Sequence, residues 1–201
     1  LWPRALFEQA WAQFRRGNFG RVLGILSAFD SPFLADEVIA EIEVLRALSF
    51  FENCRYDQAL AATDRLLKLR PLYDRLTQRL QRSADPSSWV GLLRRRQQLE
   101  DDLLSGYLER LARRPEVKQA LAVYSGAEKE YARLLGSGVE PVYLSALERT
   151  FRSRFEILAG QTGETIMRGA IRTRVSLADL LKQALAIRVE LEEQTTKVMR
   201  Q

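Results

Sequence analysis

The chain has 201 residues and is rich in Leu, Ala, Arg, Glu and Gln, with only 11 Gly and 6 Pro. It has no histidine, which removes the commonest general base and metal ligand, and its one cysteine, Cys54, excludes an intrachain disulfide. The net charge is +5, but nine basic residues balance nine acidic ones up to Pro71, so the surplus lies in the later part. The abundant residues favour helices and no stretch alternates like a strand, so we predict an all-α chain.

The first segment predicts a pair of helices. The first runs from Arg4 to Arg16, with Phe7, Trp11 and Phe14 on one stripe. Gly17-Asn18 ends it, because both residues tolerate the left-handed conformation of a helix end. The second helix runs from Phe19 to about Phe29 and ends at Asp30-Ser31-Pro32.

A second pair of helices follows in the stretch ALSFFENCRYDQALAATDRLLKLRP, from Ala47 to Pro71. One helix ends near Asn53, Cys54-Arg55 forms a corner, and the next helix runs from Tyr56 to about Leu69. A shift of 37 residues superimposes the two pairs, with a longer link expected around 31–36. The matched positions are Ala10 with Ala47, Phe14 with Phe51, Gly17 with Cys54, Phe19 with Tyr56 and Leu23 with Leu60.

This pattern resembles the tetratricopeptide repeat family over about residues 4–71. Ala10 and Ala47, one in each copy, match the family's small residue in the first helix. Phe19 and Tyr56 match the aromatic residue that opens the second helix. In the second copy, Ala59 and Pro71 match the later Ala and the closing Pro. The first copy departs at Val22 and at Pro32, which lies two residues early. The GNF corner and the DR-x-L-x-L-x-P close are similar to repeat lipoproteins of the Gram-negative outer-membrane assembly machinery.

From Leu72 onward the repeat stops and longer helices are predicted. The clearest break is 83–88, SADPSS, which offers helix N-caps. Short turns between long helices favour antiparallel packing, so we expect two repeat-like hairpins at 1–71 and a helical domain, a bundle of longer antiparallel helices, at 72–201. The expected helices are 72–82, 87–113, 115–135, 140–158 and 164–199, with joints at Gly136-Ser137-Gly138, at Gly160 and Gly163, and near Ser176.

No catalytic pattern stands out. There is no Gly-rich phosphate loop, cysteine pair or serine-nucleophile motif, so we expect no enzyme, cofactor, metal or small-molecule substrate. The acidic clusters Glu100-Asp101-Asp102 and Glu190-Glu192-Glu193 point in different directions on helices and are expected to be solvated. The run Arg94-Arg95-Arg96 is expected to form a solvated collar.

The resemblance implies a groove for an extended peptide or a partner helix, lined by the first helix of each hairpin. Trp11 is the favoured anchor, because large amphipathic rings are enriched at interface hot spots, whereas Phe14 and Phe51 are expected to belong to the core. Carried over by position, the partner-binding residues are Arg4, Phe7, Trp11, Arg15, Glu41, Val44, Leu48 and Glu52.

We therefore expect a non-catalytic adaptor or scaffold that holds a protein partner in a larger assembly. The alternative is nucleic-acid or anionic-surface binding through the basic C-terminal helices, with nucleic acid disfavoured; a third is a homo-oligomerisation module. No apolar run is long enough to span a membrane. The resemblance implies the periplasmic face of the bacterial outer membrane, with the cytoplasm as the alternative. Because the chain opens on Leu1, we expect a processed protein or an excised piece.

Overall fold

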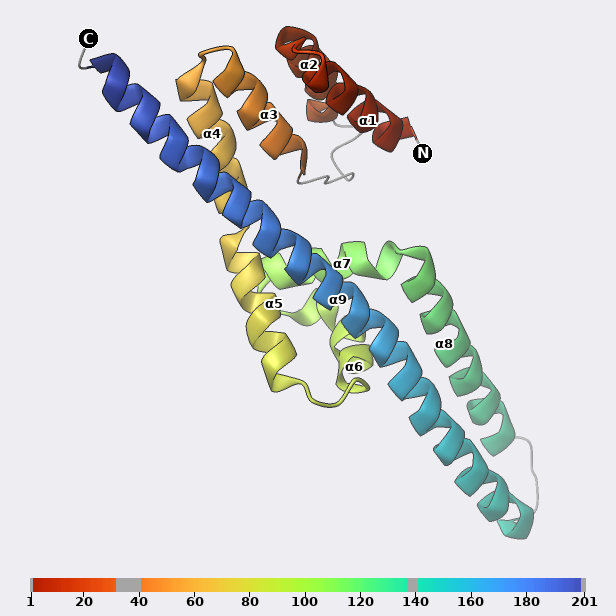
Figure 1. The fold of residues 1–201 in the computed structure, drawn as a ribbon. Coiled ribbons are helices and arrows are strands. Elements are labelled where there is room, and N and C mark those ends of the chain that lie inside the picture. The colour runs from red at the N-terminus through yellow and green to blue at the C-terminus, as the bar shows by residue number, and fades with distance from the viewer. Residues whose placement is uncertain (1, 32–40, 137–140, 200–201) are drawn as a thin grey trace. The chain divides into compact units, whose positions relative to one another are not determined.

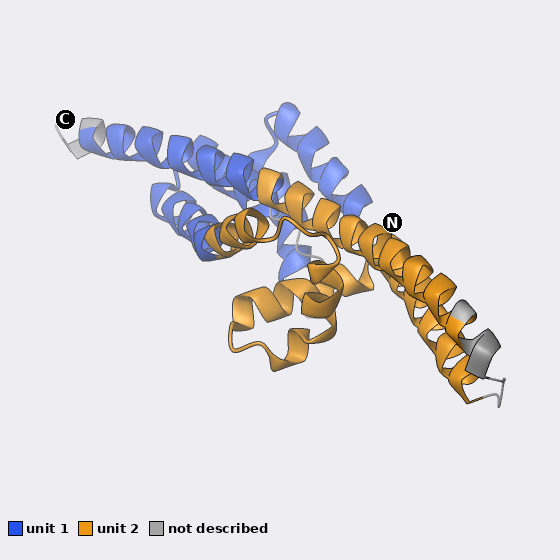
Figure 2. Ribbon diagram, turned by 90° about the horizontal axis from the view of Figure 1, so that it is seen from below, with its two compact units in different colours: residues 1–71, 176–201 blue, residues 72–175 orange. Residues whose placement is uncertain are grey.

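A computed structural model describes residues 2–31, 41–136 and 141–199, and every regular element in these ranges is a helix (Figure 1). The predicted all-α class is therefore confirmed. The chain divides into two compact units, shown in separate colours in Figure 2. Unit 1 comprises residues 1–71 together with the C-terminal stretch from Ser176, and unit 2 comprises residues 72–175.

Unit 1 contains two helical hairpins whose corners have the same backbone geometry 37 residues apart. Gly17 and Cys54 both adopt positive φ, at +75° and +55°. The Gly17 N–H donates to the Phe14 carbonyl and the Cys54 N–H donates to the Phe51 carbonyl, each at 2.9 Å. The hairpins consist of α1 (Trp2–Arg15), α2 (Phe19–Leu26) with the 3-10 turn η1 (Ser27–Asp30), α3 (Glu41–Glu52) and α4 (Tyr56–Leu67).

Small residues allow the paired helices to approach closely. Ala10 of α1 and Ala47 of α3 are both fully buried, as predicted for the position where a side chain larger than a methyl group would separate the helices. The first hairpin and the start of α3 share one core cluster, formed by Ala10, Val22, Leu26, Phe29, Ile42 and Leu45.

One arginine joins the two hairpins. The side chain of Arg46 on α3 is only 12% exposed. Its guanidinium donates to the Leu26 carbonyl at 3.0 Å and to Asp30 Oδ1 at 2.8 Å, and it pairs with Glu43 at 3.1 Å. Glu43 also accepts from Arg65 of α4 at 2.7 Å. This network links α2, η1, α3 and α4, and nothing in the local sequence pattern indicated it.

We expect Arg46→Met to lower the free energy of unfolding by about 2–3 kcal/mol, because a nearly buried carbonyl and two carboxylates lose a charged donor. Chemical denaturation followed by circular dichroism measures this loss. The control is Arg55→Met: Arg55 is exposed at the second corner and donates to Gln58 alone among the described side chains, so its loss should cost under about 1 kcal/mol. Equal losses in the two variants would contradict a linking role for Arg46.

The end of the longest helix, α9 (Pro141–Met199), completes unit 1. Leu180, Ala184, Ile187 and Leu191 recur at intervals of four, three and four residues, so they share one face. This face packs on both helices of the second hairpin, and Arg188 pairs with Asp64 of α4 at 2.7 Å. We call residues 177–191 the docked segment. The buried residues that receive it are Val44, Ala47, Ala59, Ala62 and Leu66.

This packing divides the chain differently from the predicted 72–201 domain, since the stretch from Ser176 groups with the hairpins. The physical reason is the apolar face of the docked segment. It finds its buried surface on α3 and α4, more than 100 residues earlier in the chain.

Unit 2 surrounds Trp89, its largest fully buried side chain. Leu93, Leu108, Leu111, Val117 and Ile166 are also buried to within 1% exposure. Burial raises the pKa of the Tyr107 phenol, which donates to Thr173 Oγ1 at 3.4 Å. The complete helices of unit 2 are α6 (Ser88–Arg94), the 3-10 turn η3 (Arg96–Gln98), α7 (Asp102–Arg113) and α8 (Pro115–Leu135). Unit 2 also includes α5 (Arg70–Arg82) from Leu72 onward and α9 up to Val175.

The predicted continuous helix from Ser87 to Arg113 is wrong, because the chain leaves the helix after Arg94. Polar side chains stabilise the break. Asp101 accepts from the Leu104 N–H at 3.2 Å and caps α7, and Ser105 Oγ donates to the Arg96 carbonyl at 2.8 Å. The acidic run at 100–102 therefore lies at the start of a helix. The spacing of the apolar residues alone does not indicate this start.

The joints predicted at Gly160, Gly163 and Ser176 are also wrong, because α9 continues through all three positions. Gly163 serves close packing instead. A Cβ atom placed on it would overlap the Pro86 carbonyl group, so the 83–88 turn approaches the helix backbone directly. The predicted link at 31–36 and the Gly-Ser-Gly joint at 136–138 extend outside the described residues.

Candidate protein-interaction surface

Three aromatic side chains of α1 form a continuous row. The rings of Phe7 and Trp11 lie 6.4 Å apart, and those of Trp11 and Phe14 lie 5.6 Å apart, both edge to face. Phe14 continues to Phe19 of α2 at 5.3 Å. Spacings of four and three residues place Phe7, Trp11 and Phe14 on one helix face, and we call them the aromatic row.

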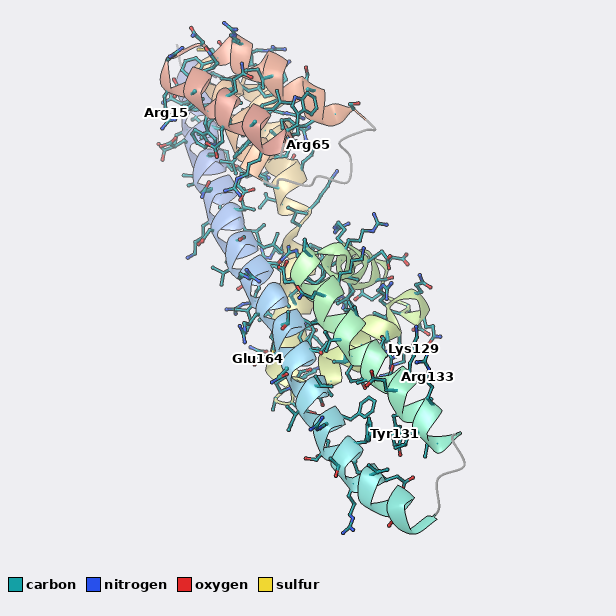
Figure 3. All side chains as sticks on the ribbon, turned by 90° about the vertical axis from the view of Figure 1, so that its right-hand side faces the viewer. Arg15, Arg65, Lys129, Tyr131, Arg133 and Glu164 are labelled. Atoms are coloured by element: carbon teal, nitrogen blue, oxygen red, sulfur yellow. The ribbon has the colours of Figure 1, made fainter. Side chains whose placement is uncertain are left out.

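The aromatic row is only partly buried. Its three residues pack against the first-hairpin core from one side and keep part of their surface open to solvent. Trp11 is thus neither a free surface ring nor a fully buried core residue. Arg4 and Arg15, one turn before Phe7 and one turn after Trp11, are exposed and form no ion pair with another described residue. Figure 3 labels Arg15 near the end of α1.

The corresponding positions of the second hairpin are Val44, Leu48 and Phe51, of which Val44 is buried and the other two are partly buried. Val44 is 4% exposed within the cluster that receives the docked segment, and Leu48 and Phe51 pack against that cluster. A partner could contact Val44 only if the docked segment moved away. Glu41 and Glu52 are exposed at the two ends of α3.

The two hairpins therefore use matching positions in different ways. Phe7, Trp11 and Phe14 correspond, 37 residues on, to Val44, Leu48 and Phe51. In the second hairpin Val44 lies in the cluster that receives the docked segment, and Leu48 and Phe51 pack against that cluster. In the first hairpin the positions of Val44 and Leu48 carry the partly exposed rings of Phe7 and Trp11. Arg4 and Arg15 stand where α3 has Glu41 and Glu52. The structure thus brings Arg4, Phe7, Trp11 and Arg15 onto one helix and gives Val44 and Leu48 a packing role.

Other clusters of charged residues are engaged in structural contacts. Arg94 donates two hydrogen bonds to the Glu128 carboxylate, and its guanidinium carbon lies 5.3 Å from the ring centroid of Tyr124. Arg96 donates to Glu109, and this hydrogen bond holds the pKa of the Glu109 carboxyl below its ordinary value. Within residues 2–31, 41–136 and 141–199, no three His, Cys, Asp or Glu side chains are placed to hold a metal ion.

None of the described helices combines the length and apolar character that crossing a bilayer requires. Comparison of the chain with protein-family models, with curated proteins and with solved structures finds no match. The resemblance to tetratricopeptide repeats thus stays a prediction that rests on the residues and spacings of 4–71.

Proposed function

We propose that this chain is a non-catalytic adaptor of the tetratricopeptide-repeat type, which binds a protein partner through the aromatic row of α1. One observation carries the proposal. Of the positions of α3 that match the row, Val44 lies in the cluster that receives the docked segment, and Leu48 and Phe51 pack against that cluster. The same positions in α1 present rings with open surface, so the first hairpin offers a related surface to another chain.

The chemistry of the row suits an interface anchor. Tryptophan and arginine are among the residues most enriched at binding hot spots, and an aromatic ring beside a guanidinium can receive an apolar side chain next to a carboxylate. Arg4 and Arg15 flank the row, and neither is paired with a carboxylate of another described residue. We therefore favour a partner that presents apolar residues beside acidic ones.

The residue-level resemblance to outer-membrane assembly lipoproteins adds a setting to this proposal. A cell-envelope complex, on the periplasmic side of the outer membrane, is the first place to look for the partner, and the cytoplasm is the second. Self-association is the competing role, and sedimentation of the intact chain distinguishes it from binding of a different protein.

The proposal is tested by affinity capture with the intact chain, compared between wild type, Trp11→Ala and Trp2→Ala, with the captured proteins quantified by mass spectrometry. For a specific partner, Trp11→Ala should weaken the binding free energy by roughly 2 kcal/mol or more, which is about a 30-fold loss of affinity. Trp2→Ala is the matched control, because Trp2 lies on the same helix, is 63% exposed and is outside the aromatic row.

Because Trp11 is partly buried, its replacement also affects packing, so a second variant separates binding from stability. Arg4→Glu with Arg15→Glu changes two exposed side chains. This variant should leave the melting temperature nearly unchanged and should bind the same partner more weakly. If Trp11→Ala loses the roughly 3–5 kcal/mol of stability typical of a core aromatic and the arginine variant binds normally, the aromatic row is structural and the proposal fails.

A further inference from the structure

The positive charge of the chain is concentrated in unit 2. Residues 72–175 contain 18 Lys and Arg against 13 Asp and Glu, whereas the rest of the chain has 13 of each. Five of the acidic side chains in unit 2 are engaged in ion pairs with arginines: Asp101, Glu109, Glu116, Glu128 and Glu164. The surplus therefore belongs to arginines and lysines elsewhere in unit 2.

Two of these arginines share one open hollow near the start of α9. Arg149, Thr150, Ser153 and Arg154 line a shallow, open hollow on the surface of this helix. Intervals of one, three and one residues place all four on one side of the helix. Neither Arg149 nor Arg154 forms an ion pair with another described residue. The two guanidinium groups give the charged donors that phosphate oxygens accept from.

Packing against α8 determines which side of this part of α9 faces outward. Phe151 and Phe155 lie on the other side of the helix, with ring centroids 5.7 and 5.8 Å from that of Tyr131. Phe155 also meets Tyr124 at 5.8 Å. Figure 3 labels Tyr131, together with Lys129 and Arg133, on the last turns of α8. The aromatic contacts pack the other side of this part of α9 against α8, and the side with Arg149 and Arg154 stays exposed.

Exposed aliphatic side chains bracket the arginines. Leu147 is 38% exposed and Ile157 is 56% exposed. The positions 147, 150, 154 and 157 follow helical spacing, so Leu147, Thr150, Arg154 and Ile157 form one stripe beside Arg149 and Ser153. The acidic residues of this stretch are Glu148 and Glu156, and the four-residue interval aligns Glu156 with Arg152. The stripe itself carries no acidic residue.

We propose that residues 147–157 of α9 dock the protein on an anionic phospholipid surface. The two arginines would contact headgroup phosphates, and Leu147 and Ile157 would enter the boundary between headgroups and acyl chains. Apolar side chains beside arginines are what an interfacial helix uses, and each basic residue near an anionic leaflet adds to the attraction. A nucleic-acid backbone would engage the arginines but gives no role to the exposed aliphatics. This surface and its ligand are distinct from the proposed partner site on α1.

The test is flotation of the full chain with vesicles of phosphatidylcholine alone and of phosphatidylcholine with about 30% phosphatidylglycerol. We expect binding to the anionic vesicles only, decreasing as salt increases. Arg149→Glu with Arg154→Glu should weaken vesicle binding at least tenfold. The matched control is Arg82→Glu with Arg110→Glu, which makes the same charge change at exposed positions of unit 2 outside the hollow and should have a clearly smaller effect.

Ile157→Ser distinguishes a membrane from other polyanions, because it removes an exposed aliphatic side chain and leaves the charge unchanged. It should weaken vesicle binding and leave binding to heparin or to a short DNA duplex unaltered. The inference is overturned if neutral vesicles bind equally well, or if the control pair loses as much as Arg149→Glu with Arg154→Glu. It is also overturned if duplex DNA binds more tightly than anionic vesicles and Ile157→Ser changes neither. Circular dichroism verifies that each variant is folded.

Discussion

Replacement of Gly163 by alanine is expected to destabilise unit 2 by about 3 kcal/mol or more, because among the described glycines an added Cβ meets its closest contact here. The added Cβ would overlap the carbonyl carbon and oxygen of Pro86 and would lie 3.0 Å from the Ser87 nitrogen. All three atoms are backbone, so no side-chain rotation relieves the clash, and the 83–88 turn must move away from α9. Urea denaturation followed by circular dichroism measures the loss.

Gly160→Ala is the control for this prediction, because it places the same methyl group three residues earlier on the same helix. Apart from the helix itself and the chain neighbours of Gly160, no described heavy atom lies within 4 Å of the point that this methyl carbon would occupy. There alanine should be neutral or stabilise by up to about 1 kcal/mol, since glycine is the poorer helix former. A stable Gly163→Ala variant would show that the turn does not pack against the helix backbone.

Replacement of Ile187 by aspartate is expected to detach the docked segment from the second hairpin, at a cost of about 3 kcal/mol or more. Ile187 is 7% exposed at the centre of the segment, between Ala184 and Leu191, which are fully buried. A carboxylate there would have to enter an apolar cluster or separate α9 from α3 and α4. Detachment would uncover Val44, Leu48 and Phe51, so increased binding of a hydrophobic dye should accompany the lower stability.

Val189→Asp makes the same chemical change two residues later, on the side of the helix that faces away from the hairpin. Val189 is 56% exposed, so this variant should lie within about 0.5–1 kcal/mol of the parent and bind no additional dye. Equal behaviour of the two variants would mean that the docked segment does not contribute to the stability of unit 1.

The helical hairpins can be predicted from the sequence because their signals are local. Residues that favour helices, a small residue at Ala10 and Ala47, and corners at Gly17 and Cys54 all act within one or two turns of the chain. For the same reason the repeated register of 37 residues and the stripe of Phe7, Trp11 and Phe14 follow from the order of residues alone. The surplus of basic residues after Pro71 also follows directly from the sequence.

The predictions that proved wrong share a different cause. Joints are expected at Gly160 and Gly163, because a glycine in a helix usually weakens it. Gly163 instead allows a turn from another part of unit 2 to touch the helix backbone, and only the position of Pro86 reveals that. The helix predicted across 95–101 is interrupted because the side chains of Asp101 and Arg96 form hydrogen bonds with backbone groups. The spacing of apolar residues, on which the prediction is based, does not indicate such hydrogen bonds.

By itself, the sequence determined the all-α class, the two helical hairpins and the aromatic stripe of the first helix. Tertiary structure alone decided what covers the apolar faces of the helices. The contact between Arg188 and Asp64 joins residues 124 positions apart, and the docked segment occupies α3 positions that the family resemblance assigns to a partner. Periodicity shows that a helix face is apolar, but the hydrophobic effect has no direction, so any complementary apolar surface of the chain can bury that face.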